Sequence, residues 1–168
     1  MTRKKQIIIG IDPGTRITGY GIIETDLRSH TPLDYGCIRP SPSLPLHERY
    51  KIIHEGIAHL LDTYPAAALS VETQFVSRNA QSALKLGMAR GVAILAATQR
   101  NIPVFEYAPK KAKAAIVGTG SASKAQMQGM VQTLLCLSEI PTPEDAADAL
   151  ALAICHAHSI KPIKVPHV

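Results

Sequence analysis

The sequence predicts an α/β fold in which helices flank a mixed sheet of five strands. Short apolar segments rich in β-branched residues alternate with longer segments in which apolar residues recur at helical spacing. The first three predicted strands follow one another closely, which favours an antiparallel meander. The last two strands are each reached through a helix, which adds them to the same sheet by crossovers. The 168 residues suffice for one compact domain, residues 1–168, and are too few for two full lobes.

Five segments have the pattern of strands: residues 6–12, 17–24, 33–39, 68–72 and 103–107. The first contains four isoleucines in a short run and is predicted to be fully buried. A Pro-Gly-Thr turn follows it. Gly19 and Gly21 in the second segment are expected to allow another backbone to approach closely.

Helices are predicted at residues 46–64, 79–99, 109–117, 123–137 and from the Pro-Thr-Pro segment to residue 158. The first carries apolar residues at helical spacing and is ended by Pro65. In the second, Ala83, Gly87 and Gly91 form a stripe of small residues that permits close contact with another helix. Residues 159–168 are expected to form a loose basic tail.

The composition favours a polyanionic partner. Lys and Arg number 18 against 13 Asp and Glu, a net charge of +5 that suits nucleic acid, although many soluble proteins are mildly basic. Three widely spaced cysteines indicate free thiols in a reducing cytoplasm. No secretory signal is recognised, and no apolar run reaches the ~18 residues that a membrane span needs.

Four carboxylates lie in or beside apolar segments: Asp12, Glu72, Asp145 and Asp148. Such positions are costly for a charge unless a cation or hydrogen bonds compensate it. Asp12 and Glu72 end predicted strands, where functional groups of α/β sheets collect. Asp145 and Asp148 are three residues apart and share one helix face. Together they predict a site for Mg²⁺, with Mn²⁺ as the alternative, acting on a phosphate backbone.

Each acid also has a simpler interpretation. Asp12 could begin an Asp-Pro-Gly turn, and Glu72 could be a solvated strand end. Thr142 and Asp145 have the spacing of a capping box. Asp148 is harder to explain in this way because its helix face is apolar. The argument therefore depends on the four acids as a set.

Basic and aromatic residues supply a second signal. The basic cluster comprises Arg78, Arg90, Lys110, Lys111, Lys113 and Lys124. These side chains could contact DNA phosphates or simply be solvated. Phe75 lies in a polar loop after Glu72, where it could stack on an unpaired base or pack on the following helix. His156 and His158 are interpreted as structural.

Four blocks of sequence resemble the bacterial RuvC Holliday junction resolvase family: residues 9–21, 71–75, 79–93 and 145–151. They occur in the family's order and spacing, and the resemblance covers nearly the whole chain. It implies a ribonuclease H-like fold and a homodimer, with the helix containing Gly87 and Gly91 as the dimer helix. One departure is Val76, where many relatives carry a second bulky aromatic residue.

The resemblance also implies an activity, namely metal-dependent nicking of two opposed strands of a four-way DNA junction in recombination and repair. Asp12, Glu72, Asp145 and Asp148 match the family's catalytic acids. Phe75 matches an aromatic that reaches bases, and Lys113 and Lys124 match basic residues that support DNA binding or the reaction, to which Arg78 and Lys110 are added here. Cooperation with the RuvA–RuvB branch-migration complex follows by family analogy alone.

The expected mechanism is two-metal hydrolysis that leaves 5′-phosphate and 3′-hydroxyl ends, with Asp12 as the carboxylate that bridges the ions. Two rival functions differ in class. The Ile-Gly-Ile-Asp-Pro-Gly-Thr segment resembles the first phosphate loop of actin-like ATPases and sugar kinases, which need a second lobe. A non-catalytic junction-binding module is the other rival, and the complete set of four acids argues against it.

Overall fold

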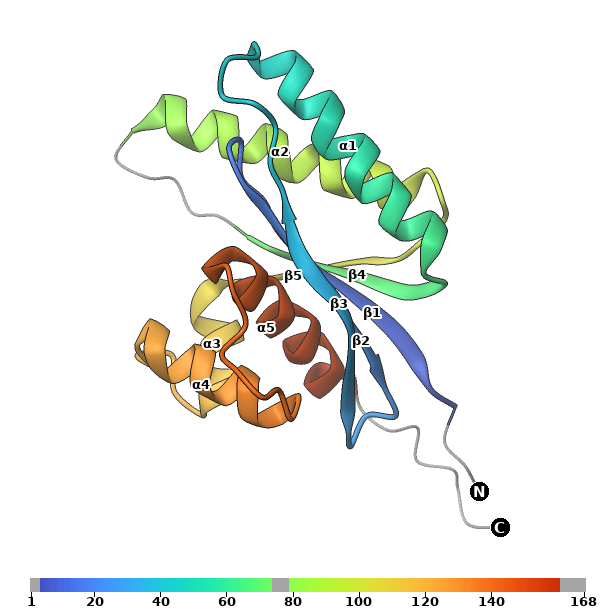
Figure 1. Ribbon diagram of the computed structural model, residues 1–168, viewed down its shortest axis with the longest axis vertical. Coiled ribbons are helices and arrows are strands. Elements are labelled where there is room, and N and C mark those ends of the chain that lie inside the picture. Colours follow the sequence, from blue (N-terminus) through green and yellow to red (C-terminus); the bar gives the residue numbers. More distant parts are fainter. Residues whose placement is uncertain (1–3, 74–78, 161–168) are drawn as a thin grey trace.

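The computed structural model describes residues 4–73 and 79–160, and its centre is a five-stranded sheet (Figure 1). The strand order is β3-β2-β1-β4-β5. The strands are β1 (Gln6–Asp12), β2 (Thr18–Thr25), β3 (His30–Ile38), β4 (Ala66–Glu72) and β5 (Val104–Tyr107). β1, β2 and β3 pair antiparallel, whereas β4 pairs parallel with both β1 and β5. The predicted mixed sheet is confirmed.

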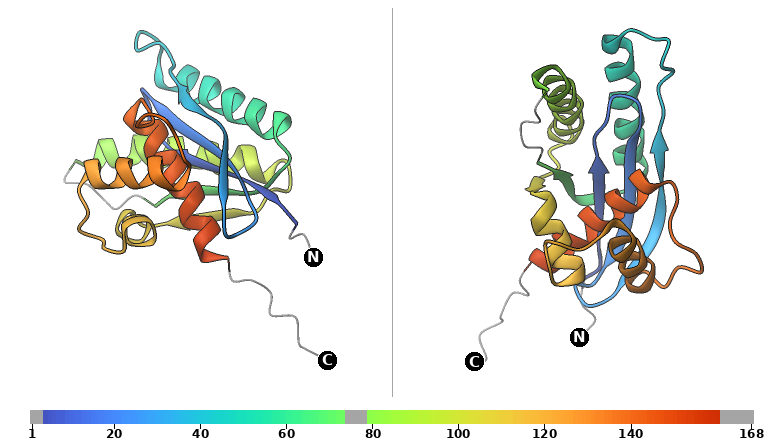
Figure 2. Two further views of the ribbon diagram at one scale, coloured as in Figure 1. Left: turned by 60° about the horizontal axis from the view of Figure 1, so that its bottom comes forward. Right: turned by 90° about the vertical axis from the view of Figure 1, so that its left-hand side faces the viewer.

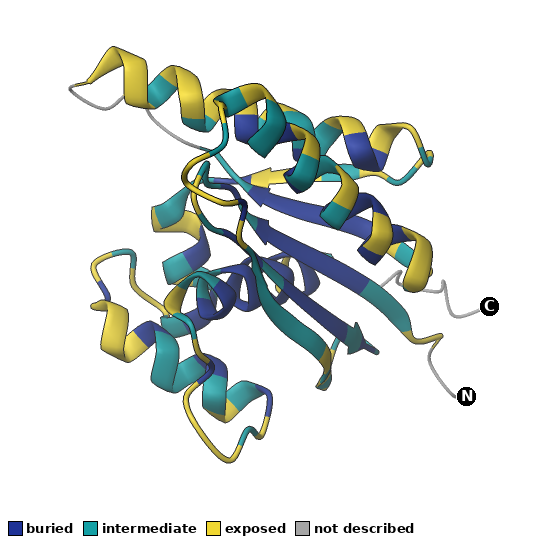
Figure 3. Cartoon of the chain, turned by 45° about the horizontal axis from the view of Figure 1, so that its top comes forward, coloured by how far each residue is buried: buried dark blue, intermediate teal, exposed yellow. Residues whose placement is uncertain are grey.

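Helices cover the two faces of the sheet in separate groups (Figure 2). One face carries α1 (Leu46–Thr63) and α2 (Ala80–Thr98). The other carries α5 (Glu144–Ser159), with α3 (Pro109–Val117) and α4 (Lys124–Leu134) packed beside it. The central strand is buried on both sides, and Figure 3 shows buried residues in dark blue along the inner strands of the sheet.

Alternation along β1 sends its isoleucines into two cores. Ile9 and Ile11 pack with α1 and α2, whereas Ile8 packs with α4 and α5. A strand with apolar side chains on both faces has to be covered on both faces, which is why the isoleucine run predicts a buried strand.

Helix α5 lies directly on the sheet because the strands beneath it lack side chains at the contact. A Cβ atom at Gly10 would lie 1.9 Å from the backbone oxygen of Ala149, and one at Gly19 would lie 2.0 Å from that of Asp145. Ser70 Oγ on β4 also donates a hydrogen bond of 2.8 Å to the carbonyl oxygen of Leu152. The predicted close approach at Gly19 is confirmed, and it fixes the start of α5 over the ends of β1 and β2.

Two predicted boundaries are wrong by three residues for local reasons, and β4 begins at Ala66 rather than at residue 68. β3 begins at His30 rather than at residue 33, because it pairs with β2 over its whole length. α4 ends at Leu134 rather than at residue 137, since Cys136 adopts a left-handed backbone conformation with φ of 52°. The expected loose tail does not begin at residue 159, because Ser159 is the last residue of α5, and residues 161–168 lie outside the described residues.

Over the two described ranges, no helix combines the length and apolar character needed to cross a membrane.

Candidate active site

A pocket opens at the ends of the two central parallel strands. Asp12 ends β1 and Glu72 ends β4, one position beyond the paired residues Ile11 and Val71. Asp148 reaches the same pocket from the first turns of α5. The pocket has a volume of about 280 Å³, and its lining residues are Asp12, Glu72, Pro109, Ala112, Lys113, Lys124, Met127, Asp148, Ala151 and Leu152. Three of the four predicted acids therefore share one cavity with two of the predicted lysines.

Burial and mutual repulsion make these acids hold their protons tightly. The pKa of Asp12 is raised to about 8, first by burial and then by the charges of Asp148, Glu72 and Asp145. Burial also raises the pKa of Glu72, with Asp148 adding to it and Lys113 and Lys124 opposing it. The pKa of Asp148 rises for the same main reason, against the effect of Lys124. A divalent cation in the pocket would relieve this repulsion.

Two lysines bring positive charge to the pocket from α3 and α4. Lys113 lines it from α3. Lys124 begins α4, directly after Ser123, whose Oγ accepts a hydrogen bond of 3.2 Å from the backbone nitrogen of Gln126. The ammonium group of Lys124 pairs with Glu144 and lies 3.9 Å from Asp148 Oδ2. Its position is thus set by a helix cap on one side and by two carboxylates on the other.

Asp145 is less directly placed than the other acids. It lies in the first turn of α5, above Gly19, and its charge contributes to the raised pKa of Asp12, but it does not line the pocket. The capping-box interpretation is wrong, because the residue before the helix is Pro143 and no side chain caps it. Asp145 thus has no capping role, and its link to the pocket is the effect of its charge on Asp12.

Three predicted basic contacts, Arg90, Lys110 and Lys111, do not line the pocket. Lys110 is exposed, and Lys111 lies over the ring of Tyr107, 5.1 Å from its centroid. Arg90 on α2 pairs with Glu106 on β5 instead of facing the pocket. Phe75 and Arg78 lie outside the described residues. Glu144, the partner of Lys124, was missed because it stands beside Asp145 and nothing in the sequence distinguishes the two.

The acids do not form a finished ligand shell. In the described ranges, no three His, Cys, Asp or Glu side chains are already grouped so that they could hold a metal ion. The chemistry of the pocket nevertheless fits a hard divalent cation, because its anionic groups are all carboxylates and its walls are otherwise apolar or cationic.

Comparison with known proteins matches one family over most of the chain. The family described as "Crossover junction endodeoxyribonuclease RuvC" matches residues 8–156. The protein of that name from Protochlamydia amoebophila is 62% identical over 151 residues, which cover 90% of each chain.

Solved structures place the fold in the same group. T. thermophilus RuvC in complex with a Holliday junction substrate is 35% identical, with a TM-score of 0.87 over 92% of this chain and 94% of the other. The yeast mitochondrial Holliday junction resolvase Ydc2 is 14% identical, with a TM-score of 0.64 over 90% of this chain and 78% of the other, and shows the shared fold alone. The fold is thus the predicted ribonuclease H-like one, and this chain belongs to the RuvC family of crossover junction endodeoxyribonucleases.

Proposed function

We propose that this chain resolves four-way DNA junctions by paired, symmetric nicks, and that the pocket between β1, β4 and α5 cuts the phosphodiester bond. The observation that carries the proposal is the joint placement of Asp12, Glu72 and Asp148 with Lys113 and Lys124 around one cavity. Family membership supports the reaction, since nucleases of the RuvC family depend on metal ions. The actin-like rival has no such support from the family match.

The acids are assigned as metal ligands, with Mg²⁺ as the ion, Mn²⁺ as the alternative, and two ions per site. When bound, such ions lower the pKa of a water molecule and stabilise the leaving 3′ oxygen, so that 5′-phosphate and 3′-hydroxyl ends result. Asp12 would be the ligand shared by the two ions, because the charges of the three other acids all raise its pKa. Asp145 is proposed to complete the set from the first turn of α5.

The lysines are proposed to hold the DNA backbone. Lys113 and Lys124 line the pocket that a phosphate would enter, and Lys124 would then exchange its carboxylate partners for that phosphate. Lys110 lies exposed on the same helix as Lys113 and extends this basic surface. For Phe75 and Arg78 the proposal depends on the sequence alone, with Phe75 stacking on an unpaired base and Arg78 contacting phosphate.

A homodimer is proposed through the outer face of α2. Leu84 and Met88 are 68% and 55% exposed, and their spacing of four residues places them together on this face. Gly87 and Gly91 have no atom within 4 Å of the position of a Cβ, so another helix can approach closely there. Two-fold symmetry would place one active site on each of two opposed strands. Cooperation with RuvA–RuvB, and action in the cytoplasm, are carried over by family analogy.

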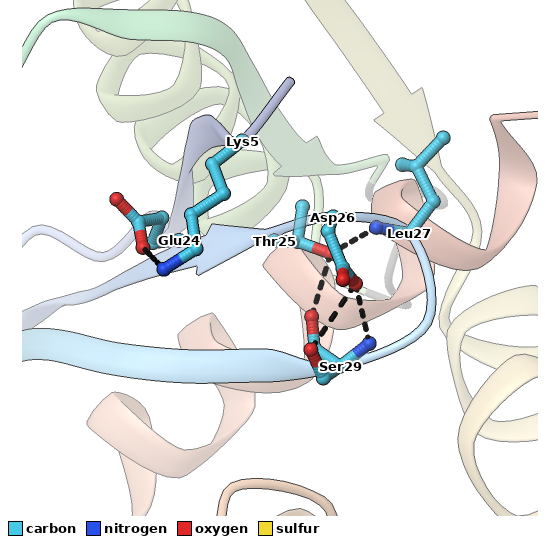
Figure 4. A network of polar contacts seen from close by, with 6 residues as sticks. All are labelled: Lys5, Glu24, Thr25, Asp26, Leu27 and Ser29. Atoms are coloured by element: carbon cyan, nitrogen blue, oxygen red, sulfur yellow. Dashed lines mark hydrogen bonds and ion pairs between the residues drawn. The ribbon is translucent and has the colours of Figure 1, made fainter. Parts of the chain in front are cut away.

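The decisive test of the site is Glu72→Gln. The variant keeps the shape of the side chain and removes a charged ligand, so junction binding should remain while cleavage falls by at least about a hundredfold. The assay is nicking of a synthetic four-way junction with and without Mg²⁺, beside a binding assay in EDTA. Glu24→Gln is the matched control, because Glu24 forms a surface pair of 2.6 Å with Lys5 on the far part of the sheet (Figure 4).

Cleavage by Glu72→Gln near the wild-type rate would remove Glu72 from the site. Wild-type protein that binds the junction without any metal-dependent cutting would favour the non-catalytic binding module instead. The dimer is tested separately by Leu84→Glu, which should shift the sedimenting species from dimer to monomer. Ile140→Glu alters another exposed apolar side chain and should leave the species unchanged.

A further inference from the structure

Two histidines from distant parts of the chain face each other through their Nε2 atoms. His30 begins β3, and His158 lies in the last turn of α5. Their Nε2 atoms are 3.1 Å apart. The ring centroids are 5.1 Å apart, so the rings meet edge to edge through these nitrogens and do not stack. This pair lies outside the pocket of the acids.

The other nitrogen of each ring is already engaged. His158 Nδ1 lies 2.9 Å from the backbone oxygen of Ala115 on α3. A carbonyl oxygen only accepts, so His158 carries its hydrogen on Nδ1 and presents a lone pair on Nε2. His30 Nδ1 lies 2.8 Å from Thr25 Oγ1. Outer hydrogen bonds of this kind to Nδ1 are typical of histidines that bind metal through Nε2.

The turn that directly precedes His30 is ordered by hydrogen bonds among Thr25, Asp26, Leu27 and Ser29 (Figure 4). Asp26 Oδ1 accepts hydrogen bonds from the backbone nitrogens of Arg28 and Ser29, at 2.9 and 2.8 Å. Thr25 Oγ1 accepts from the backbone nitrogen of Leu27, at 2.9 Å, and lies 3.1 Å from the oxygen of Ser29. The turn therefore fixes both His30 and the hydroxyl group that contacts its Nδ1.

We propose that His30 and His158 bind one divalent late first-row metal ion, of the class Zn²⁺, Ni²⁺ or Cu²⁺, through their two Nε2 atoms. With metal–nitrogen bonds of about 2.0–2.1 Å, the nitrogen separation of 3.1 Å corresponds to an angle of about 100° at the metal. That angle lies between those of square and tetrahedral coordination. His158 is exposed, so water can fill the remaining positions.

Metal binding needs no net loss of a proton from the pair. Without metal, His30 Nε2–H can donate to His158 Nε2 while Thr25 donates to His30 Nδ1. With metal, the hydrogen of His30 moves to Nδ1 and is donated to Thr25 Oγ1, whose own hydrogen turns to the oxygen of Ser29. Every polar atom keeps a partner in both states.

The two sites select different metals. Imidazole nitrogens favour Zn²⁺, Ni²⁺ and Cu²⁺, whereas the carboxylates around Asp12 favour Mg²⁺ and Mn²⁺. An ion at the histidines would join the β2–β3 turn to the end of α5 and, through Ala115, to α3. The expected role is structural, as a clamp between the meander and the helix that carries Asp145 and Asp148.

The test is thermal unfolding of untagged protein in excess Mg²⁺, with and without Ni²⁺. At free Ni²⁺ tenfold above the measured dissociation constant, the unfolding midpoint should rise by about 3–6 °C. His30→Gln and His158→Gln should each abolish the rise. His54→Gln is the matched control, because His54 contacts Gln99 on another face of the protein, and it should keep the rise. Asp148→Asn should keep it as well.

A second measurement does not depend on the folding of any variant. The electron paramagnetic resonance spectrum of wild-type protein with one equivalent of Cu²⁺ should show splitting from two equatorial imidazole nitrogens. A spectrum with oxygen donors alone or a single nitrogen would overturn the proposal. So would a Ni²⁺-dependent rise in midpoint that survives in either histidine variant, or one that disappears in Asp148→Asn.

Discussion

Neutralising Asp12 should make the metal-free protein more stable while it abolishes cleavage. Asp12 is buried among Glu72, Asp145 and Asp148, and its pKa is raised to about 8 from 3.8. The folded state therefore holds a proton that the unfolded state releases between these two values. The contribution of Asp12 to the free energy of unfolding is fully present below pH 3.8 and is lost as pH rises through 8. Above that pH this contribution no longer changes.

The size of the effect follows from the shift. A difference of about four pKa units corresponds to about 6 kcal/mol, and water in the open pocket reduces this to about 3–6 kcal/mol. Asp12→Asn keeps the shape and removes the charge, so at pH 9 it should be more stable than wild type by this amount. For a chain of 168 residues, the unfolding midpoint should rise by at least about 6 °C.

The measurement is urea and thermal unfolding in EDTA at pH 5, 7 and 9. Saturating Mg²⁺ should reduce the difference in stability between Asp12→Asn and wild type, because the ion compensates the charges of the wild-type acids. Asp62→Asn is the control of opposite sign, since a hydrogen bond from Arg100 lowers the pKa of Asp62 and its neutralisation should cost a little stability. Wild-type stability that stays level from pH 5 to 9, or an Asp12→Asn variant no more stable than wild type at pH 9, would refute the reasoning.

Three further predictions concern the packing of α5 on the sheet. Gly10→Ala should lower the free energy of unfolding in urea by about 3 kcal/mol or more and strongly reduce cleavage, because its Cβ would meet the backbone of Ala149. Gly129→Ala on α4 is the control: its Cβ would meet nothing within 4 Å, so the change should be neutral or stabilising. Ser70→Ala should cost about 1 kcal/mol by the same assay through loss of the bond to Leu152. Burial lowers the pKa of His156, so its contribution to stability is full above pH 6.5 and is lost as pH falls through the lowered value. Unfolding midpoints of His156→Gln should therefore depend less on pH between 7 and 4.

The strands and the placement of the acids could be predicted because local patterns specify them. The isoleucine run of β1 is fully buried at Ile8, Ile9 and Ile11, as its composition indicates. Asp12 and Glu72 both follow such buried runs, so neighbouring strands bring them together. Gly19 and Gly21 on β2 likewise predicted the close approach of another backbone, which is that of α5.

Contacts between distant side chains could not be predicted in this way. The pairing of Lys124 with Glu144 depends on how the connection after α4 returns to α5. His158 was interpreted as structural, and nothing local shows that it meets His30, 128 residues away. Within the chain, α1 packs on Ala89, Ala93, Ala96 and Ala97 of α2, so the close helix contact expected at Gly87 and Gly91 stays a prediction about a second copy of the chain.

The parallel pairing of β1 with β4 also sets a length. Neighbouring strands lie ~4.8 Å apart, and Asp12 and Glu72 each stand one step beyond the last paired residues of these strands. The main-chain hydrogen bonds between β1 and β4 therefore set the distance between the backbones of Asp12 and Glu72. Repulsion between the two carboxylates can rotate their side chains but cannot move their Cα atoms apart. The protein therefore keeps this backbone spacing even when no cation is bound.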